Sequence, residues 1–347
     1  MNKFVVLLLS AVLALSGISK AQNKSGFPKV KIHGLAFGDF FYNVENHNPS
    51  LMDLNGVNFR RIYFTGDFII ANNFSSRFRL ETDYIGRPNR NELGVMVKDA
   101  WLKWHNIFKG SDLVFGLSPT PAFDVSEAVW GHRYLEKTIM DLNHIVGSRD
   151  LGIDLKGNFN QSGSLKYWVK LGNNSGNKAE ANKFKRYYGL LEFIPSSNFL
   201  IVVYGDFASA DPIVDPYDDQ SKNNNSVVGA LFLNYKEKGI FSLGFEGFIR
   251  STQNGVISAI SPSESLQGRG ISIWAYTNLS KVVQLVARYD NVNLNTDASN
   301  DGKSLILAGV QFNPTTEVSI TPNIEVFSYQ SGVKSDVIPR ITFYLQF

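Results

Sequence analysis

The sequence of 347 residues contains no cysteine. A chain without thiols has no disulfide bonds, no thiolate metal site and no cysteine nucleophile. A secreted chain of this size must then be held together either by its core or by a closed, hydrogen-bonded sheet. The absence of cysteine therefore excludes disulfide-stapled extracellular folds and thiol enzymes.

Long apolar runs are also missing after the first twenty-odd residues. A membrane-spanning helix needs about 20 consecutive apolar residues, and no later window approaches that length. The mean hydropathy of −0.10, with 44% hydrophobic and 19% charged residues, is too apolar for a disordered chain. These values exclude a bundle of membrane helices, whereas a spanning β-barrel, whose strands alternate, escapes this test.

The first 21 residues have the pattern of a secretory signal peptide. Lys3 supplies a positive charge, residues 4–15 form an apolar run too short to span a bilayer, and small residues surround Ala21. We expect cleavage before Gln22, with a retained membrane anchor as the alternative. Residues 22–347 then form a single domain.

An excess of charge of either sign is missing as well. Without Lys3 and Lys20, 34 basic residues become 32, against 31 acidic ones, and the formal net charge falls from +3 to +1. Proteins that bind nucleic acid usually carry a basic patch and a positive balance. The composition therefore predicts no nucleic-acid partner.

What the sequence does contain is alternation of apolar and polar residues, which indicates β-strands. No long stretch has the 3.6-residue period of a helix. Most of the strands have about the 9–11 residues that a tilted membrane strand needs. The sixteen predicted strands are 29–44, 57–71, 74–84, 95–107, 111–118, 149–159, 163–173, 185–195, 198–208, 225–237, 239–251, 268–278, 281–291, 303–313, 316–329 and 336–347.

The connections between these strands alternate between short and long. The short ones are one to three residues, such as Asn72-Asn73 and Pro314-Thr315, and the long ones include 45–56, 119–148 and 209–224. One end of the sheet is therefore always tight, as in outer-membrane barrels with short periplasmic turns and long outer loops. We predict an all-β, transmembrane, antiparallel up-and-down barrel of about 16 strands in the Gram-negative outer membrane, its outer face in lipid.

A barrel of this size encloses water, since eight strands are filled by their own side chains and sixteen to eighteen leave a lumen. The polar residues of each strand should face that lumen and the apolar residues should face lipid. Strong ion selectivity needs a ring of charges of one sign, and the lumen predicted here is mixed. The charged residues that we expect to line it are Arg61, Arg77, Arg79, Glu81, Asp83, Asp99, Lys103, Lys166, Lys170, Arg288 and Arg340. A local basic cluster at Arg61, Arg77 and Arg79 would bias the channel toward anions.

Three stretches resemble one family. They are GVNFRRIYFTG at 56–66, VKDAWLKW at 97–104 and FGLSPTP at 115–121, followed by SRDLGI at 148–153. In this order they are similar to the phosphate-selective porins O and P, over roughly the first half of the mature chain. The resemblance implies a sixteen-stranded trimeric porin, with the connection after the fifth strand folded into the lumen as a constriction.

That connection, residues 119–148, is the candidate constriction loop, and an outer loop packed on the barrel mouth is the alternative. The resemblance implies a lumenal ladder of arginines and a lysine cluster for phosphate. This chain departs from that pattern, because the loop sets four acidic residues, Asp124, Glu127, Glu136 and Asp141, against Arg133 and Lys137. We therefore expect a general diffusion porin for small hydrophilic solutes or ions, with at most a mild preference for anions. Arg133 and Lys137 join the predicted pore-lining residues.

Two other classes of function compete with a channel. A barrel hydrolase needs a Ser–His pair or paired carboxylates, and the five histidines stand in no recognisable motif. A non-channel structural or adhesive β-protein would conduct no ions. The sequence predicts no enzyme, no cofactor and no metal site, because no metal-ligand spacing or phosphate-binding glycine motif is present.

The chain ends on the alternating segment ITFYLQF, residues 341–347. An exposed strand edge of this kind promotes aggregation, so we expect this strand to pair with the first one and close the barrel. The apolar residues of the segment should then face lipid. The resemblance adds that the terminal aromatic, Phe347, is an assembly signal for the barrel assembly machinery.

Overall fold

The structure, a computed structural model, describes residues 28–84 and 93–347. The predicted signal peptide and most of the predicted connection 85–94 lie outside the described residues. None of the helices in the described residues is long and apolar enough to cross a membrane.

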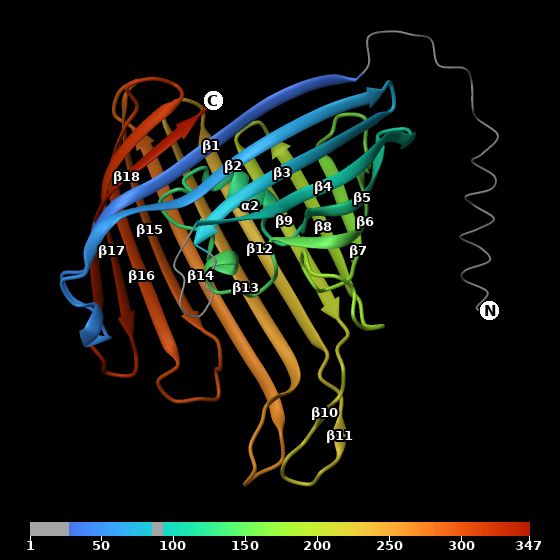
Figure 1. The fold of residues 1–347 in the computed structure, drawn as a ribbon, viewed down its shortest axis with the longest axis vertical. Coiled ribbons are helices and arrows are strands. Elements are labelled where there is room, and N and C mark those ends of the chain that lie inside the picture. The colour runs from blue at the N-terminus through green and yellow to red at the C-terminus, as the bar shows by residue number, and fades with distance from the viewer. Residues whose placement is uncertain (1–27, 85–92) are drawn as a thin grey trace.

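The chain forms a closed barrel of sixteen antiparallel strands, which confirms the predicted fold class (Figure 1). Each strand pairs with its neighbours in the chain, and β1 pairs with both β2 and β18. The barrel strands are β1 (Lys29–Tyr42), β2 (Asn55–Ala71), β3 (Phe74–Tyr84), β4 (Leu93–Phe108), β5 (Ser111–Pro119), β6 (Arg149–Asn158), β7 (Leu165–Gly172), β8 (Arg186–Ser196), β9 (Phe199–Ala208), β12 (Ser226–Glu237), β13 (Phe241–Val256), β14 (Glu264–Asn278), β15 (Val283–Asn293), β16 (Gly302–Phe312), β17 (Val318–Tyr329) and β18 (Asp336–Gln346).

All sixteen predicted strands are present, and the largest differences are at the β13–β14 hairpin. These two strands stay paired out to Val256 and Glu264, beyond the predicted ends at 251 and 268. Beyond the apolar belt, on the side of the long loops, both faces of the hairpin are mostly polar. An alternation of apolar and polar residues therefore no longer identifies the strand there. The loop between β9 and β12 also holds a small unpredicted hairpin, β10 (Ile213–Val214) with β11 (Ser221–Lys222).

The tight turns lie at the end of the barrel that holds the C-terminus and the start of β1, and the long loops lie at the other end (Figure 1). The loop after β1 contains a short 3-10 helix, η1 (Pro49–Leu51). The loop after β5 contains two helices, α2 (Asp124–Trp130) and α3 (Ile139–Leu142). The asymmetry of the two ends is that of an outer-membrane barrel.

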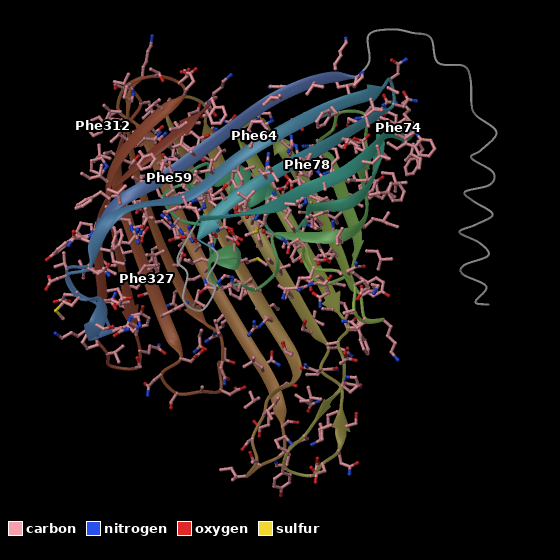
Figure 2. All side chains as sticks on the ribbon, viewed as in Figure 1. Phe59, Phe64, Phe74, Phe78, Phe312 and Phe327 are labelled. Atoms are coloured by element: carbon pink, nitrogen blue, oxygen red, sulfur yellow. The ribbon has the colours of Figure 1, made fainter. Side chains whose placement is uncertain are left out.

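The outside of the barrel is an apolar belt. Phe64 on β2 and Phe78 on β3 lie on the outer face, where Figure 2 labels them, and they are 49% and 44% exposed. Exposed aromatics gather at the end with the tight turns, as in an aromatic girdle: Phe108, Tyr235, Phe241, Phe312 and Phe347. A continuous apolar surface of this extent fits the hydrocarbon core of a lipid bilayer and not water.

Candidate functional site

The loop of residues 120–148 folds into the barrel and has a small core of its own. The side chains of Trp130, Leu135, Ile139 and Met140 are completely buried. Helix α2 ends at Gly131, whose φ of 68° lies in the left-handed region that glycine adopts without strain. The chain reverses there and continues across the lumen.

One anchor of the loop is Arg60 on β2. Its guanidinium donates a hydrogen bond to the carbonyl of Leu135 and forms an ion pair with Glu136, at 3.1 Å. Asp39 on β1 lies 3.7 Å from the same guanidinium. A planar guanidinium with several fixed donors can hold a carbonyl and a carboxylate together, so Arg60 ties the loop to the β1–β2 wall.

The second anchor is the wall formed by β14, β15 and β16. His132 lies 2.6 Å from the side-chain oxygen of Gln284, and Tyr134 donates a hydrogen bond to Gln311. Arg288 donates to the carbonyl of Lys137 at 2.5 Å. Trp130 packs against Trp274 with a centroid separation of 5.1 Å. The loop is therefore held at two separate parts of the inner wall.

Arg60 points into the lumen because β2 contains a β-bulge. Phe37 pairs with Arg61 and the next residue of β1, Gly38, pairs with Phe59, so Arg60 has no partner in the register. A bulge lets two consecutive side chains occupy the same face. Lys98 on β4 is skipped in the same way, between Asp99 and Val97. Strict alternation assigned neither residue to the lumen, although two adjacent charged residues in an apolar strand are a usable signal for a bulge.

The inner wall of β2 to β6 carries a network of ion pairs. Glu81 forms ion pairs with both Arg61, at 2.6 Å, and Lys98, at 2.9 Å. Asp99 lies between Arg79, at 3.2 Å, and Arg149, at 2.5 Å. Each of these carboxylates is shared by two cations, so the basic residues of the wall are largely neutralised where they stand.

The remaining predicted residues also have charged partners. The ion pairs are Arg77–Asp67 at 2.6 Å, Arg61–Asp83, Lys103–Asp112 at 3.7 Å, Lys166–Glu192 at 2.6 Å, Arg340–Asp39 at 2.8 Å and Arg340–Glu325 at 3.0 Å. Arg133 pairs inside the loop with Glu127 and Asp141, whereas Lys137 is in no ion pair within the described residues. Arg61, Arg77, Arg79, Asp83, Lys103, Lys166 and Arg340 are partly exposed on the inner side.

Four of the predicted pore-lining residues are covered on the inner face, and their role in lining the passage stays a prediction. Glu81, Asp99, Lys170 and Arg288 are 0–4% exposed. Lys170 is enclosed by Asp154, at 3.1 Å, and Ser118, at 2.5 Å. The reason is that the loop and the ion-pair network cover the wall there. A sequence pattern gives the face of a strand but not what lies over it.

A set of paired charges of both signs can hydrate a lumen without strongly selecting an ion. Rings of one sign confer selectivity, and here cations and carboxylates alternate within ion-pair distance. The described residues contain no group of three or more side chains suited to hold a metal ion. The site is therefore a polar inner wall of paired charges with a loop folded against it.

No protein-family model matches the sequence, and no curated protein matches it. Solved structures do match its fold. The outer-membrane channel DcaP of Acinetobacter baumannii has a TM-score of 0.66 at 11% identity, over 95% of this chain and 100% of that one. The anion-selective porin from Comamonas acidovorans has a TM-score of 0.65 at 10% identity, over 92% and 100%. Salmonella typhi OmpF, in a complex with daunomycin, has a TM-score of 0.64 at 12% identity, over 92% and 98%.

These similarities extend over nearly the whole chain and over nearly the whole of each match. At 10–12% identity they concern the fold alone, and they do not single out the phosphate-selective group that the sequence motifs resemble. The chain has the sixteen-stranded β-barrel fold of outer-membrane porins.

Proposed function

We propose that this protein is an outer-membrane porin, a water-filled channel through which small hydrophilic solutes and ions diffuse passively. The observation that carries the proposal is the contrast between the two faces of the wall. The outer face is an apolar belt, and the inner face carries the ion pairs and the inward loop that constricts the lumen. An aqueous passage across a bilayer requires this distribution.

The finer selectivity follows from the charges that the network leaves unpaired. Lys137 on the inward loop and Lys156, Arg250 and Lys303 on the inner face are partly exposed and form no ion pair in residues 28–84 and 93–347. Asp124 is a carboxylate that is likewise partly exposed and in no ion pair within the described residues. Glu246 is also unpaired there, but it is only 2% exposed and so is not accessible from the passage. This small excess of accessible cations supports a mild preference for anions. The arginines of the motifs that resemble phosphate porins are already paired with carboxylates, which argues against a dedicated phosphate site.

We expect purified protein in a planar lipid bilayer to give discrete conductance steps. In a potassium chloride gradient the reversal potential should indicate a chloride-to-potassium permeability ratio of roughly 1–3, because mixed charges select weakly. Arg250→Gln should move that ratio toward 1. Heat-modifiable migration on a denaturing gel is the control for a folded barrel. A folded barrel without any conductance would overturn the proposal in favour of an adhesive or structural role.

The resemblance also implies a homotrimer, and we include that assembly in the proposal. The closed barrel needs no partner to satisfy its backbone, so the oligomeric state is a separate question from channel activity. The molecular mass of the detergent-solubilised protein, measured by light scattering, distinguishes three copies from one.

One observation favours a hydrolase as the second candidate. At the end of the barrel with the tight turns, Ser75 Oγ lies 2.7 Å from His105 Nε2, and His105 Nδ1 lies 3.4 Å from Asp112. This is the order of contacts in a catalytic triad. However, Ser75 sits inside β3, between its register partners Ile69 and Lys103, where backbone N–H groups serve the sheet. Backbone N–H groups that pair in a strand are not free to form an oxyanion hole, on which catalysis by acyl transfer depends strongly.

We therefore expect a fluorophosphonate probe, which labels activated serines, to leave the folded protein unlabelled. Ser75→Ala should behave like the wild type toward this probe. Labelling of the wild type that disappears in both Ser75→Ala and His105→Ala would establish the hydrolase instead.

A further inference from the structure

The lumen is divided, toward the end with the tight turns, into a charged part and an uncharged part. On β2 to β8 this end carries the pairs Arg77–Asp67, Lys103–Asp112 and Lys166–Glu192. On β14 to β18 the inward residues at the same end are tyrosines, amides and a serine. We call this second set the tyrosine–amide wall: Tyr276, Gln284, Gln311, Asn313, Ser319 and Tyr344.

This wall and one side of the inward loop line an open cavity of about 580 Å³. The loop contributes Gly131, His132 and Tyr134 to its lining, and Lys281, in the turn between β14 and β15, is its one residue with a permanent charge. Both ring nitrogens of His132 already contact protein oxygens, the carbonyl of Trp130 and the side-chain oxygen of Gln284, each at 2.6 Å. Ligand sites typically have volumes of roughly 300–1,000 Å³ and a few placed polar groups. The cavity is of that size, and apart from the exposed Lys281 its lining offers no charge to balance a charged ligand.

The polar groups of the wall are held in position by one another. Gln284 donates from its amide nitrogen to Asn278 at 2.8 Å while its oxygen contacts His132. Gln311 donates to Asn313 at 2.6 Å and accepts from Tyr134. A primary amide has two N–H donors, so Gln284 keeps one N–H beyond the bond to Asn278. Because these donors and acceptors are already ordered, ligand binding loses little side-chain conformational entropy.

Two partly exposed aromatic rings complete the cavity. The ring of Tyr276 is stacked on Trp274, with an interplanar angle of 3° and a centroid separation of 6.0 Å, and lies 5.0 Å from His132. Tyr344 packs against Tyr134 at 5.2 Å. Within the described residues the hydroxyl of Tyr276 makes no hydrogen bond. The rings are therefore fixed by neighbours while part of their surface, and one free hydroxyl, remain for a ligand.

From this combination we infer that the cavity is a binding subsite for neutral saccharides on the permeation path. Sugar rings present C–H faces that pack on aromatic rings, and their hydroxyl groups both donate to and accept from amides and hydroxyls. An amine would lose its hydration here and find no counter-charge, which is costly, and inorganic phosphate would find only the single exposed cation Lys281. The inference rests on the proposed channel function and names a class of solute that binds within it.

The test is the ion current of the channel with maltotriose added on the side of the tight turns. The trisaccharide should reduce the current in a saturable way, and poly(ethylene glycol) of similar hydrodynamic size should not saturate. Tyr276→Ala should raise the half-blocking concentration about tenfold, since an aromatic platform carries much of such binding. Tyr276→Phe, which keeps the ring and removes the free hydroxyl, should raise it by a smaller factor.

A matched control is Trp101→Ala, which removes an inward aromatic ring from the charged part of the lumen. Trp101 contacts Arg77 and Lys103, each 5.6 Å from its ring, and none of the tyrosine–amide wall. The half-blocking concentration of maltotriose for the Trp101→Ala channel should equal that for the wild type. Heat-modifiable migration establishes that each variant is folded, and the Phe variant keeps the test valid if an Ala variant misfolds.

The outcomes separate the inference from the proposed function. A wild-type channel that conducts ions but is not blocked by maltotriose overturns the saccharide subsite and leaves the porin intact. Block that is equally weakened by Trp101→Ala also overturns the subsite, because the binding is then elsewhere. The absence of any current overturns the porin itself.

Discussion

Trp130→Ala is expected to produce a channel with several-fold higher and noisier conductance in the same folded barrel. Trp130 is the centre of the inward loop: its side chain is completely buried and its indole N–H donates to the carbonyl of Glu136 at 2.9 Å. It also packs on Trp274, and the guanidinium of Arg288 lies 5.5 Å from its ring. One side chain thus joins the loop's own core to its second anchor.

The free energy lost when the Trp130 side chain is removed determines whether the loop stays docked. Truncation of a buried tryptophan to alanine costs about 3–5 kcal/mol. That cost acts on the docking of the loop, because the loop contributes no strand to the barrel and the sheet is closed without it. A loop held by a few hydrogen bonds, each worth about 0.5–1.5 kcal/mol net, does not remain docked against such a loss. The loop should then move in and out of the lumen, and the current should rise and fluctuate with it.

Single-channel recording of the variant measures both effects. The matched control is Trp104→Ala, which removes a tryptophan from the outer side of β4, where Trp104 packs on Phe74 at 5.4 Å. That control should leave the mean conductance and its noise unchanged. If Trp130→Ala gave a wild-type current in a heat-modifiable barrel, the loop would not be the narrowest part of the passage.

The strands of this barrel could be predicted because each one separates lipid from water. That separation imposes a two-residue period on the side chains, and the length of the bilayer sets the length of the strand. On β2, Phe64 is 49% exposed on the outside, while its neighbour Thr65 is 1% exposed. The predicted strand ends are least accurate where a strand no longer separates lipid from water. The β13–β14 hairpin, which extends beyond the apolar belt on the side of the long loops, is the example.

The site could be predicted only in part, for two physical reasons. The first is the pair of bulges, which turn Arg60 and Lys98 inward against the period. The second is contact across the lumen. Arg60 and Glu136 are far apart in the sequence, and so are His132 and Gln284. Periodicity in a single strand carries no information about such contacts, and for that reason the burial of Lys170 and Arg288 was missed.

The uncharged part of the lumen also has a signal in the sequence. The inward positions of β17 and β18 near the tight turns are Ser319, Thr321, Thr342 and Tyr344, whereas β3 and β4 have Arg77 and Lys103 at that end. A list of charged residues describes selectivity for ions and overlooks the positions without charge. The distribution of amides and tyrosines along successive strands is the signal that points to neutral solutes.

At the seam of the barrel, Phe347 extends the pairing of β18 with β1 by one residue. Its N–H donates to the carbonyl of Gly34 at 3.0 Å, and the N–H of Gly34 donates to the carbonyl of Phe347 at 2.8 Å. The ring of Phe347 lies over Gly34, where a Cβ atom would meet ring carbons at 2.5 Å and 2.8 Å. The side chain is otherwise 63% exposed on the outside. Phe347 therefore contributes one pair of hydrogen bonds and little buried surface.

Deletion of Phe347 should reduce the amount of assembled barrel in the outer membrane at least tenfold while its refolding in detergent stays close to that of the wild type. Two backbone hydrogen bonds at a strand end are worth about 1–3 kcal/mol together, which is small against the closed ladder of sixteen strands. A large loss in the cell therefore requires a second role, and recognition of the terminal aromatic by the barrel assembly machinery is the role that we propose. Phe347→Ala separates the two, because it keeps both backbone hydrogen bonds and removes only the ring.

The matched control for this experiment is Phe312→Ala, which removes another exposed aromatic at the same end of the barrel. Phe312 is 44% exposed and lies at the end of β16, away from the seam. If the ring of Phe347 served only as part of the aromatic girdle, both alanine variants would lower the yield equally. If its contribution were only to close the sheet, Phe347→Ala would assemble normally and the deletion would refold poorly in detergent. A loss in cells that is specific to the ring of Phe347 and absent in detergent is the one combination that assigns it to assembly.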